Sequence, residues 1–188
     1  LYGTTGAGMA EQLKITHTID FINGTLSKAI GCFGGYICTS HSWADFIRSF
    51  ASGYIFTTSI PPSLCAAAVQ SISEIKSNAS LRTQFFRNVL LLRKYLAQVE
   101  IKFNGEESHI TNIHIGNAVK CKQIADFLMN HGGVYVQPIN YPTVPIGQEC
   151  LRITITPRHT LKHIVSLVHQ LSALALDQIK LVGRSSPL

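Results

Sequence analysis

The sequence predicts an α/β fold in two parts, because helical and strand patterns alternate along the chain. Two long apolar stripes at helical spacing run through residues 64–75 and 81–99. After residue 105 the pattern changes to strand, helix, strand, strand, helix, an alternation that packs helices against a sheet. The 188 residues suit one large domain or a little more. We place the boundary after residue 80, which gives parts 1–80 and 81–188.

The first part is expected to begin with two short strands. Residues 18–22 are mostly apolar, and a second strand is expected at residues 35–39, after a turn rich in glycine. Proline is tolerated in the first turn of a helix, so Pro61 and Pro62 mark a helix start, with Ser59 as its expected cap.

The second part alternates in type. Ile113 and Ile115 alternate with polar residues, as a half-buried strand requires, and Thr160 is placed to cap the last helix. The expected elements are strands at 113–115, 134–136 and 151–155, and helices at 117–130 and from residue 161.

Composition argues against several classes of protein. The net charge is +6, but the basic residues are scattered, so we expect no nucleic-acid partner. Residues 49–73 carry no charge, yet Gly53, Pro61 and Pro62 interrupt them, so we expect no membrane helix. Charged residues make up only 14% of the chain, which suggests surface buried against a partner or ligand.

The cysteines and histidines show no metal-binding pattern. The five cysteines contain no CxxC pair and are expected to be reduced core residues. His159 and His163 are four residues apart but lack the glutamate of a zinc protease motif, so we predict no metal site.

One lysine stands among small residues in a region with few charges. Lys28 lies in the segment GTLSKAIG, and residues 29–44 contain no Asp, Glu, Lys or Arg. If Lys28 is buried without a carboxylate, its pKa falls and the neutral amine becomes a nucleophile for aldehydes. The alternative is a solvated lysine in an exposed turn.

Two further segments could bind anions. Thr57, Thr58 and Ser59 precede the helix expected at Pro61, and a helix amino terminus attracts phosphate; capping by Ser59 alone would explain them equally well. Arg152 lies in the middle of a strand, opposite its apolar face. Its planar fork could hold a carboxylate, or it could face solvent on an edge strand.

Together these segments resemble one enzyme family over nearly the whole chain. The segment GTLSKAIGCFGGYI resembles the cofactor-lysine segment of the α-oxoamine synthases, which use pyridoxal 5′-phosphate (PLP) and have the fold type I of PLP-dependent transferases. The segments FTTSIPP, INYPTVPIGQECLRIT and TPRHT are similar to the branch that makes 5-aminolevulinate from glycine and succinyl-CoA. Ser27 and Ile155 depart from the usual pattern.

The resemblance implies a role for each candidate residue. Lys28 would form a Schiff base with PLP and remove the α-proton of glycine. Thr25 would contact the PLP phosphate, and Thr57 and Thr58 would reach it from the neighbouring subunit of a homodimer, whose active site lies at the subunit interface. Thr143 would line the acyl-CoA pocket. Arg152 would hold the glycine carboxylate.

The resemblance also implies that the chain is a fragment. It would contain the end of the large PLP domain and the small carboxyl-terminal α/β domain, without the amino-terminal half, and alone would have little or no activity. Two other synthases of the family, 2-amino-3-ketobutyrate CoA ligase and 8-amino-7-oxononanoate synthase, are alternatives, as is a fragment that only associates with a full-length subunit. The compartment would be the cytoplasm in bacteria and the mitochondrial matrix in eukaryotes.

Overall fold

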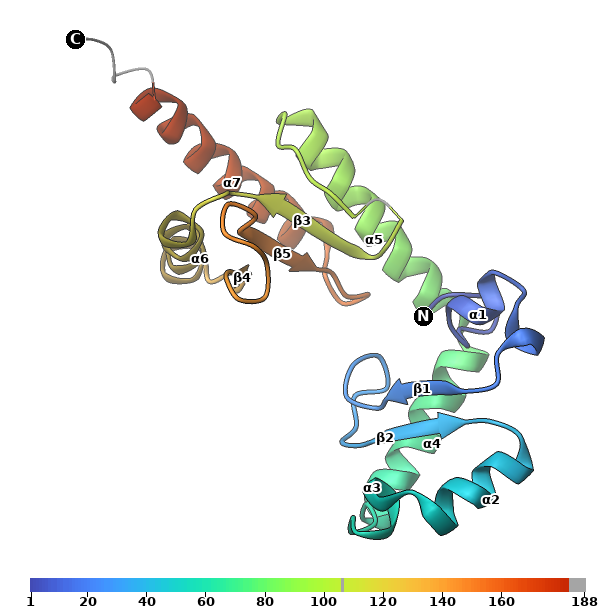
Figure 1. Ribbon diagram of the computed structural model, residues 1–188. Coiled ribbons are helices and arrows are strands. Elements are labelled where there is room, and N and C mark those ends of the chain that lie inside the picture. Colours follow the sequence, from blue (N-terminus) through green and yellow to red (C-terminus); the bar gives the residue numbers. More distant parts are fainter. Residues whose placement is uncertain (106, 183–188) are drawn as a thin grey trace. The chain divides into compact units, whose positions relative to one another are not determined.

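The computed structural model describes residues 1–105 and 107–182, and it has the α/β fold that the sequence predicts (Figure 1). The chain divides into two compact units. Unit 1 is Leu1–Arg82, and unit 2 begins at Thr83. In the described part of the chain, no helix is long and apolar enough to cross a membrane.

Unit 1 consists of a β-hairpin and several helices. Strands β1 and β2 pair antiparallel, with Ile22 opposite Cys38 and Thr25 opposite Gly35. The elements in chain order are α1 (Met9–Gln12), a 3-10 turn (Thr16–Thr18), β1 (Ile22–Thr25), β2 (Gly35–Cys38), α2 (His41–Phe50), α3 (Ser52–Ile55) and α4 (Pro62–Ser77).

The first strand lies later than the sequence predicted. The expected strand at 18–22 is wrong, since β1 begins at Ile22 and includes Asn23 and Gly24, which looked like an interruption. Gly24 lies opposite Tyr36, and a Cβ added to this glycine would come within 2.2 Å of the Tyr36 ring. The glycine therefore lets the aromatic ring lie across the hairpin. The second strand was predicted correctly.

Helix α4 begins beside its prolines but not with the expected cap. Pro62 is its first residue and Pro61 occupies the capping position, with no side-chain hydrogen bond. Capping by Ser59 is therefore wrong. Helix α2 was not foreseen, although Trp43, Phe46 and Phe50 repeat at helical spacing within it.

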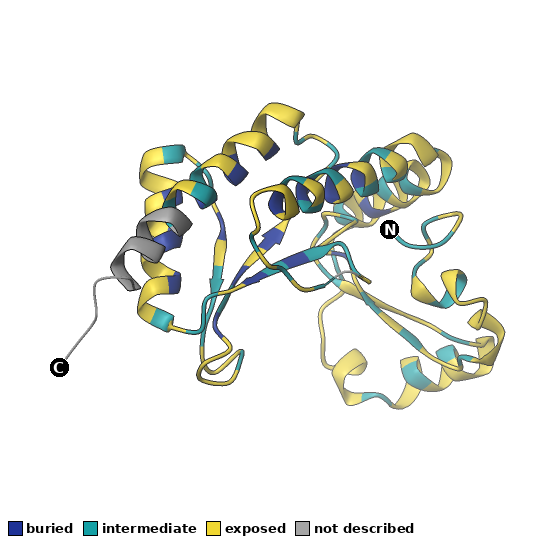
Figure 2. Ribbon diagram, turned by 90° about the horizontal axis from the view of Figure 1, so that it is seen from above, coloured by how far each residue is buried: buried dark blue, intermediate teal, exposed yellow. Residues whose placement is uncertain are grey.

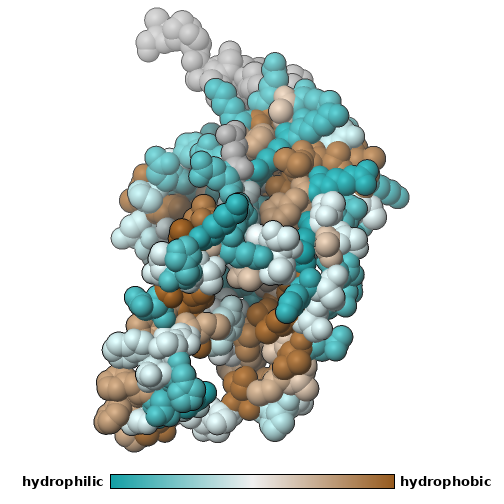
Figure 3. Space-filling view, turned by 90° about the vertical axis from the view of Figure 1, so that its right-hand side faces the viewer, coloured by the Kyte–Doolittle hydropathy of each residue, from teal (hydrophilic) through white to brown (hydrophobic). Residues whose placement is uncertain are grey.

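Unit 1 buries very little of its apolar surface. Leu26 and Ala68 are its only buried residues, and Figure 2 shows its ribbon mainly in the colours of exposed and intermediate residues. Ring contacts link Phe21 to Trp43 and Phe46 to Phe50 along an exposed face. Figure 3 shows this kind of surface as brown patches between polar ones. Unit 1 thus presents apolar side chains that it does not cover itself.

The free cysteines are not all core residues. Cys121 is buried, but Cys38 and Cys65 are exposed, so the expectation of five core cysteines is wrong for these two. Both lie in unit 1, where little is covered. Burial raises the pKa of the Cys121 thiol, which keeps it protonated at neutral pH.

Unit 2 has helices on one face of a three-stranded antiparallel sheet. The strand order is β3-β5-β4, so β5 is central. The elements are α5 (Ala79–Gln98, which starts in unit 1), β3 (Ile110–His114), α6 (Ala118–Gly132), β4 (Gln137–Ile139), β5 (Cys150–Thr154) and α7 (Leu161–Val182). In β3 and β5, buried residues alternate with less buried ones; the buried ones are Thr111, Ile113, Leu151 and Ile153. Together with the buried residues of the three helices they form the core of unit 2. The opposite face of the sheet is open.

The sequence predicted most of unit 2. Helix α6 is capped by the Asn117 side chain, which accepts from the Lys120 N–H, and is followed by Gly133 in the left-handed region. Thr160 accepts from the His163 N–H at 3.4 Å, as predicted. The strand expected at 134–136 is wrong, because β4 begins only at Gln137. Val134 and Val136 alternate with Tyr135, as apolar residues do in a strand, but all three precede the residues of β4 that pair with β5.

Asn88 is a buried polar residue that joins α5 to the segment after β5. Its Nδ2 group donates to the carbonyl oxygens of Thr156 at 3.0 Å and His159 at 2.8 Å. Asn88→Leu removes both donated hydrogen bonds, and among the described residues only the Thr156 carbonyl keeps another donor, the His159 N–H at 3.2 Å. We therefore expect the free energy of unfolding to fall by about 1–3 kcal/mol. Urea unfolding measures it. The control is Asn130→Leu at an exposed position, and equal unfolding midpoints for the two variants would contradict this role for Asn88.

Candidate functional site

Thr25 and Lys28 lie in one loop that joins the two strands of the hairpin. Thr25 ends β1, and its hydroxyl lies 2.8 Å from the Ser27 hydroxyl and accepts from the Ser27 N–H at 3.2 Å. Lys28 follows directly. The loop therefore presents two hydroxyls and a primary amine within four residues, and the sequence from Phe21 to Ala44 contains no carboxylate.

The backbone of this loop is fixed at several points. The Leu26 N–H donates to Gly34 O at 2.9 Å, and the Cys32 N–H donates to Leu26 O at 2.8 Å. From α4, the Ser71 hydroxyl donates to Ile30 O at 2.8 Å. The loop is thus held in place, although its polar side chains face outward.

Lys28 itself is exposed, so of the two alternatives this chain by itself shows the lysine in an exposed turn. Its neighbours Ser27 and Ala29 are exposed too, while Leu26 turns inward. The physical reason is that a two-stranded hairpin has too few neighbours to enclose the loop at its end. The amine is accessible to an aldehyde, and a dry environment would require further protein.

Thr57 and Thr58 lie between α3 and α4 and are exposed. The Thr57 hydroxyl donates to Gly53 O at 2.6 Å, which orders the turn after α3. No hydrogen bond within the described residues joins either threonine to the loop of Lys28. The pair therefore stands apart from Lys28 in its hydrogen bonding.

Arg152 lies on the central strand β5, not on an edge strand. Its register partners are Asn112 on β3 and Gln137 on β4, so two neutral amides flank it on the open face of the sheet. The sole ion pair among the described residues is Lys122–Asp126. Arg152 is exposed, and its guanidinium group is available for an external carboxylate.

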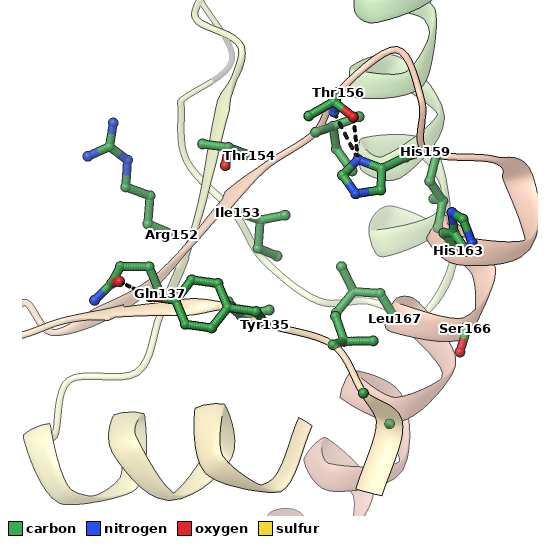
Figure 4. A pocket seen from close by; sticks show the side chains of 16 residues that line it. Tyr135, Gln137, Arg152, Ile153, Thr154, Thr156, His159, His163, Ser166 and Leu167 are labelled. Carbon is green, nitrogen blue, oxygen red and sulfur yellow. Dashed lines mark hydrogen bonds between the residues drawn. The ribbon is translucent and has the colours of Figure 1, made fainter. Parts of the chain in front are cut away.

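The amide of Gln137 beside Arg152 has a fixed orientation. Its Oε1 accepts from the Tyr135 hydroxyl, and its Nε2 donates to Pro138 O at 3.0 Å. Figure 4 shows Tyr135 and Gln137 together next to Arg152, whose side chain extends away from the histidines. These residues line one side of a cavity of about 610 Å³.

The other side of this cavity carries His159, which precedes α7, and His163, in the first turn of α7 (Figure 4). The Thr156 N–H donates to His159 Nδ1 at 2.9 Å, and the Thr160 N–H donates to His163 Nδ1 at 3.3 Å. Burial, followed by the neighbouring His163, lowers the pKa of His159. Both rings thus accept hydrogen bonds from backbone N–H groups. The described residues contain no group of three or more side chains that could bind a metal ion.

Thr143 lies in the segment 140–149 that joins β4 to β5. Its N–H donates to Asn140 O at 3.0 Å in a tight turn, and its side chain is exposed. Thr143 and Arg152 therefore belong to the same strand connection of unit 2. No hydrogen bond among the described residues joins their side chains.

Sequence reasoning missed the amide neighbours of Arg152. Gln137 could not be identified because the strand before it was expected at 134–136, and Asn112 requires the pairing register of two strands separated by a helix. The alternating pattern of residues 112–115 was the one available signal, and it indicates only which face a residue occupies.

Comparison with known proteins gives consistent results. The sequence pattern of the family "Aminotransferase class I and II" matches residues 1–171. The chain is 48% identical over 174 residues to a 5-aminolevulinate synthase of Rhizobium meliloti, covering 91% of this chain and 43% of that protein. It is 45% identical over 161 residues to an erythroid-specific, mitochondrial 5-aminolevulinate synthase of Danio rerio, covering 85% and 28%.

Solved structures agree with the fold. A structure of SPT with PLP internal aldimine matches with a TM-score of 0.88 and 28% identity, over 94% of this chain and 45% of the other. An 8-amino-7-oxononanoate synthase from Francisella tularensis matches with a TM-score of 0.83 at 23% identity, over 95% and 52%. The chain spans less than half the length of the curated relatives described above.

Proposed function

The chain belongs to the aminotransferase class I and II family, and on that premise we propose that it is the carboxyl-terminal part of a 5-aminolevulinate synthase. The proposed reaction condenses glycine with succinyl-CoA and yields 5-aminolevulinate, CoA and CO2, at the start of haem and tetrapyrrole synthesis. The observation that carries the proposal is the identity of nearly half over most of this chain to proteins of that name. In this proposal, unit 1 is the end of the large domain and unit 2 is the small domain.

The residues of unit 1 fit PLP by their chemistry. An aldehyde requires an accessible primary amine, which Lys28 provides. A phosphate requires donors without competing carboxylates, and the Thr25 and Ser27 hydroxyls lie in such a segment. When bound, PLP would supply a sink for the electrons of the glycine C–H bond. We assign its covalent attachment to Lys28 and its phosphate contact to Thr25.

The remaining roles concern orientation and proton movement. Arg152 binds the glycine carboxylate with its two-pronged guanidinium group, which fixes the direction of the α-hydrogen. Lys28 Nζ accepts that proton when its amine is neutral. Thr143 contacts the acyl-CoA.

A second subunit completes the proposed site. We assign Thr57 and Thr58 to the phosphate contact made across a homodimer interface. The exposed aromatic residues of unit 1, from Phe21 to Phe50, support burial against further protein. The proposed location is the cytoplasm of a bacterium or the mitochondrial matrix of a eukaryote, since the relatives include both bacterial and mitochondrial proteins.

An acyl-CoA panel tests the proposed reaction. The full-length enzyme that contains this chain, or a chimera with the remaining part of the Rhizobium meliloti relative, is incubated with glycine and succinyl-, acetyl- or pimeloyl-CoA. We expect 5-aminolevulinate from succinyl-CoA as the main product. A preference for acetyl- or pimeloyl-CoA would instead favour one of the sister synthases.

Titrations of the 188-residue chain and of the full-length enzyme with PLP, compared by visible absorption, test the alternative that the chain only associates with another subunit. In our proposal the isolated chain binds PLP weakly, because Lys28 is exposed, whereas the full-length enzyme shows the visible absorption band of lysine-bound PLP. A full-length protein without that band would favour association without catalysis.

A further inference from the structure

The connection that carries Thr143 is tied to the sheet at Gly147. The Gly147 N–H donates to the carboxylate Oε2 of Glu149 at 3.0 Å. Its carbonyl oxygen lies 2.9 Å from Nε2 of His114, the last residue of β3. Both peptide groups of Gly147 are therefore held by side chains, one from the connection itself and one from another strand.

The backbone around this contact is shaped to allow it. Gly116 and Gly147 both have positive φ angles, +71° and +85°, which favour glycine. A Cβ added to Gly116 would lie 3.1 Å from the His114 ring and 3.4 Å from Gly147 O. The N–H groups of Ile115 and Gly116 also donate to Glu149 O, at 2.8 and 2.9 Å. The end of β3 and the end of the connection thus approach closely.

His114 lies on the same face of the sheet as Arg152. In the register of β3 with β5, His114 is opposite Cys150 and Asn112 is opposite Arg152, and residues two apart on a strand share a face. The His114 ring is exposed, whereas Glu149 is buried. His114 can therefore be changed without opening a cavity in the core.

We propose that His114 is a positioning residue for acyl-CoA specificity, which holds the connection 140–149, and with it Thr143, beside the open face that carries Arg152. This inference rests on the proposed function for the role of Thr143, while the hydrogen bond to Gly147 stands independently of it. Because a carbonyl oxygen only accepts, the ring donates to Gly147 O through its Nε2–H.

Amide hydrogen exchange in the 188-residue chain tests the structural half of the proposal. The N–H groups of Thr143, Gly147 and Gln148 are hydrogen-bonded within the connection. His114→Leu should speed their exchange about 3- to 10-fold, the effect of losing one ordinary hydrogen bond. His114→Gln, which keeps an N–H donor, should restore the protection. The control is His169→Leu at an exposed position of α7, and the amides of β5 should be unchanged in all variants.

Steady-state kinetics of the full-length enzyme test the functional half. We expect His114→Leu to raise KM for succinyl-CoA about 3- to 10-fold, with the KM for glycine unchanged and recovery in His114→Gln. Unchanged exchange in His114→Leu would overturn the tether. Faster exchange with an unchanged KM for succinyl-CoA would overturn the specificity role. A wild-type enzyme that makes no 5-aminolevulinate would refute the proposed function, while the exchange result would still decide on the tether.

Discussion

Lys28→Ala is expected to abolish visible PLP absorption by the full-length enzyme and to lower its rate of 5-aminolevulinate formation by about 10²–10⁴-fold. Lys28 is the sole primary amine of the loop between β1 and β2, and it is accessible there. In the proposed function, removing it takes away both the covalent attachment of PLP and the group that accepts the glycine proton. Absorption spectra and a product assay measure the two effects separately.

Lys76→Ala provides the matched control, because Lys76 is an exposed lysine of the same unit at the end of α4. It should keep both the absorption and the rate. Lys28→Arg keeps the charge but cannot form the covalent bond, so it should behave like Lys28→Ala. Full absorption in Lys28→Ala would show that another amine holds the cofactor and would refute the assignment.

Unit 2 was predictable from sequence because its apolar pattern corresponds to a real core. The seam of α5 was read from spacing alone. Its middle residues Phe85, Val89, Leu92 and Leu96 are buried, whereas Leu81 and Val99 at its two ends are exposed. The error at β4 arose because alternation in Val134 and Val136 indicates an extended chain but not where pairing begins. The spacing of apolar residues thus predicted where the helices and strands lie. It could not predict which residues pair between strands, because pairing depends on the folded partner strand.

Unit 1 was harder to predict because its sequence pattern does not correspond to burial within this chain. The stripe of α4 contains Val69 and Ile72, yet both are exposed, and Ala68 is the helix's one buried residue. The lack of charges around Lys28 was compatible with a buried amine and with an exposed turn, because such a surface is covered only if the covering protein is present. That these surfaces are covered by a partner stays a prediction from composition, and composition could not show that this chain by itself leaves them open.

One part of the candidate site was also predictable from the sequence, and another part was not. Residue type and strand position were enough to single out Arg152, and the structure confirms that it lies mid-strand opposite the apolar face. Its neighbours were not predictable, because Asn112 and Gln137 come from strands far apart in sequence. Likewise the tether from His114 to Gly147 joins residues 33 positions apart, and no local pattern predicts such a contact.

Arg152→Leu is expected to raise the KM for glycine about 10- to 100-fold in the full-length enzyme, because a charge-assisted hydrogen bond contributes about 1.5–3 kcal/mol. Arg152→Lys keeps the charge but loses the planar fork, so its KM should fall between wild type and Arg152→Leu. Glycine titrations at saturating succinyl-CoA measure the effect.

A change in the KM for glycine alone would distinguish a contact of Arg152 with the glycine carboxylate from a structural role of Arg152. Arg152 is exposed between two amides, so its loss should leave the unfolding midpoint and the KM for succinyl-CoA close to wild type. Arg158→Leu, at an exposed position in the turn that follows β5, should leave the KM for glycine unchanged. If Arg152→Leu raises both KM values equally or lowers the unfolding midpoint, Arg152 acts by supporting the sheet. A selective change for glycine would place the amino-acid carboxylate on the open face of unit 2.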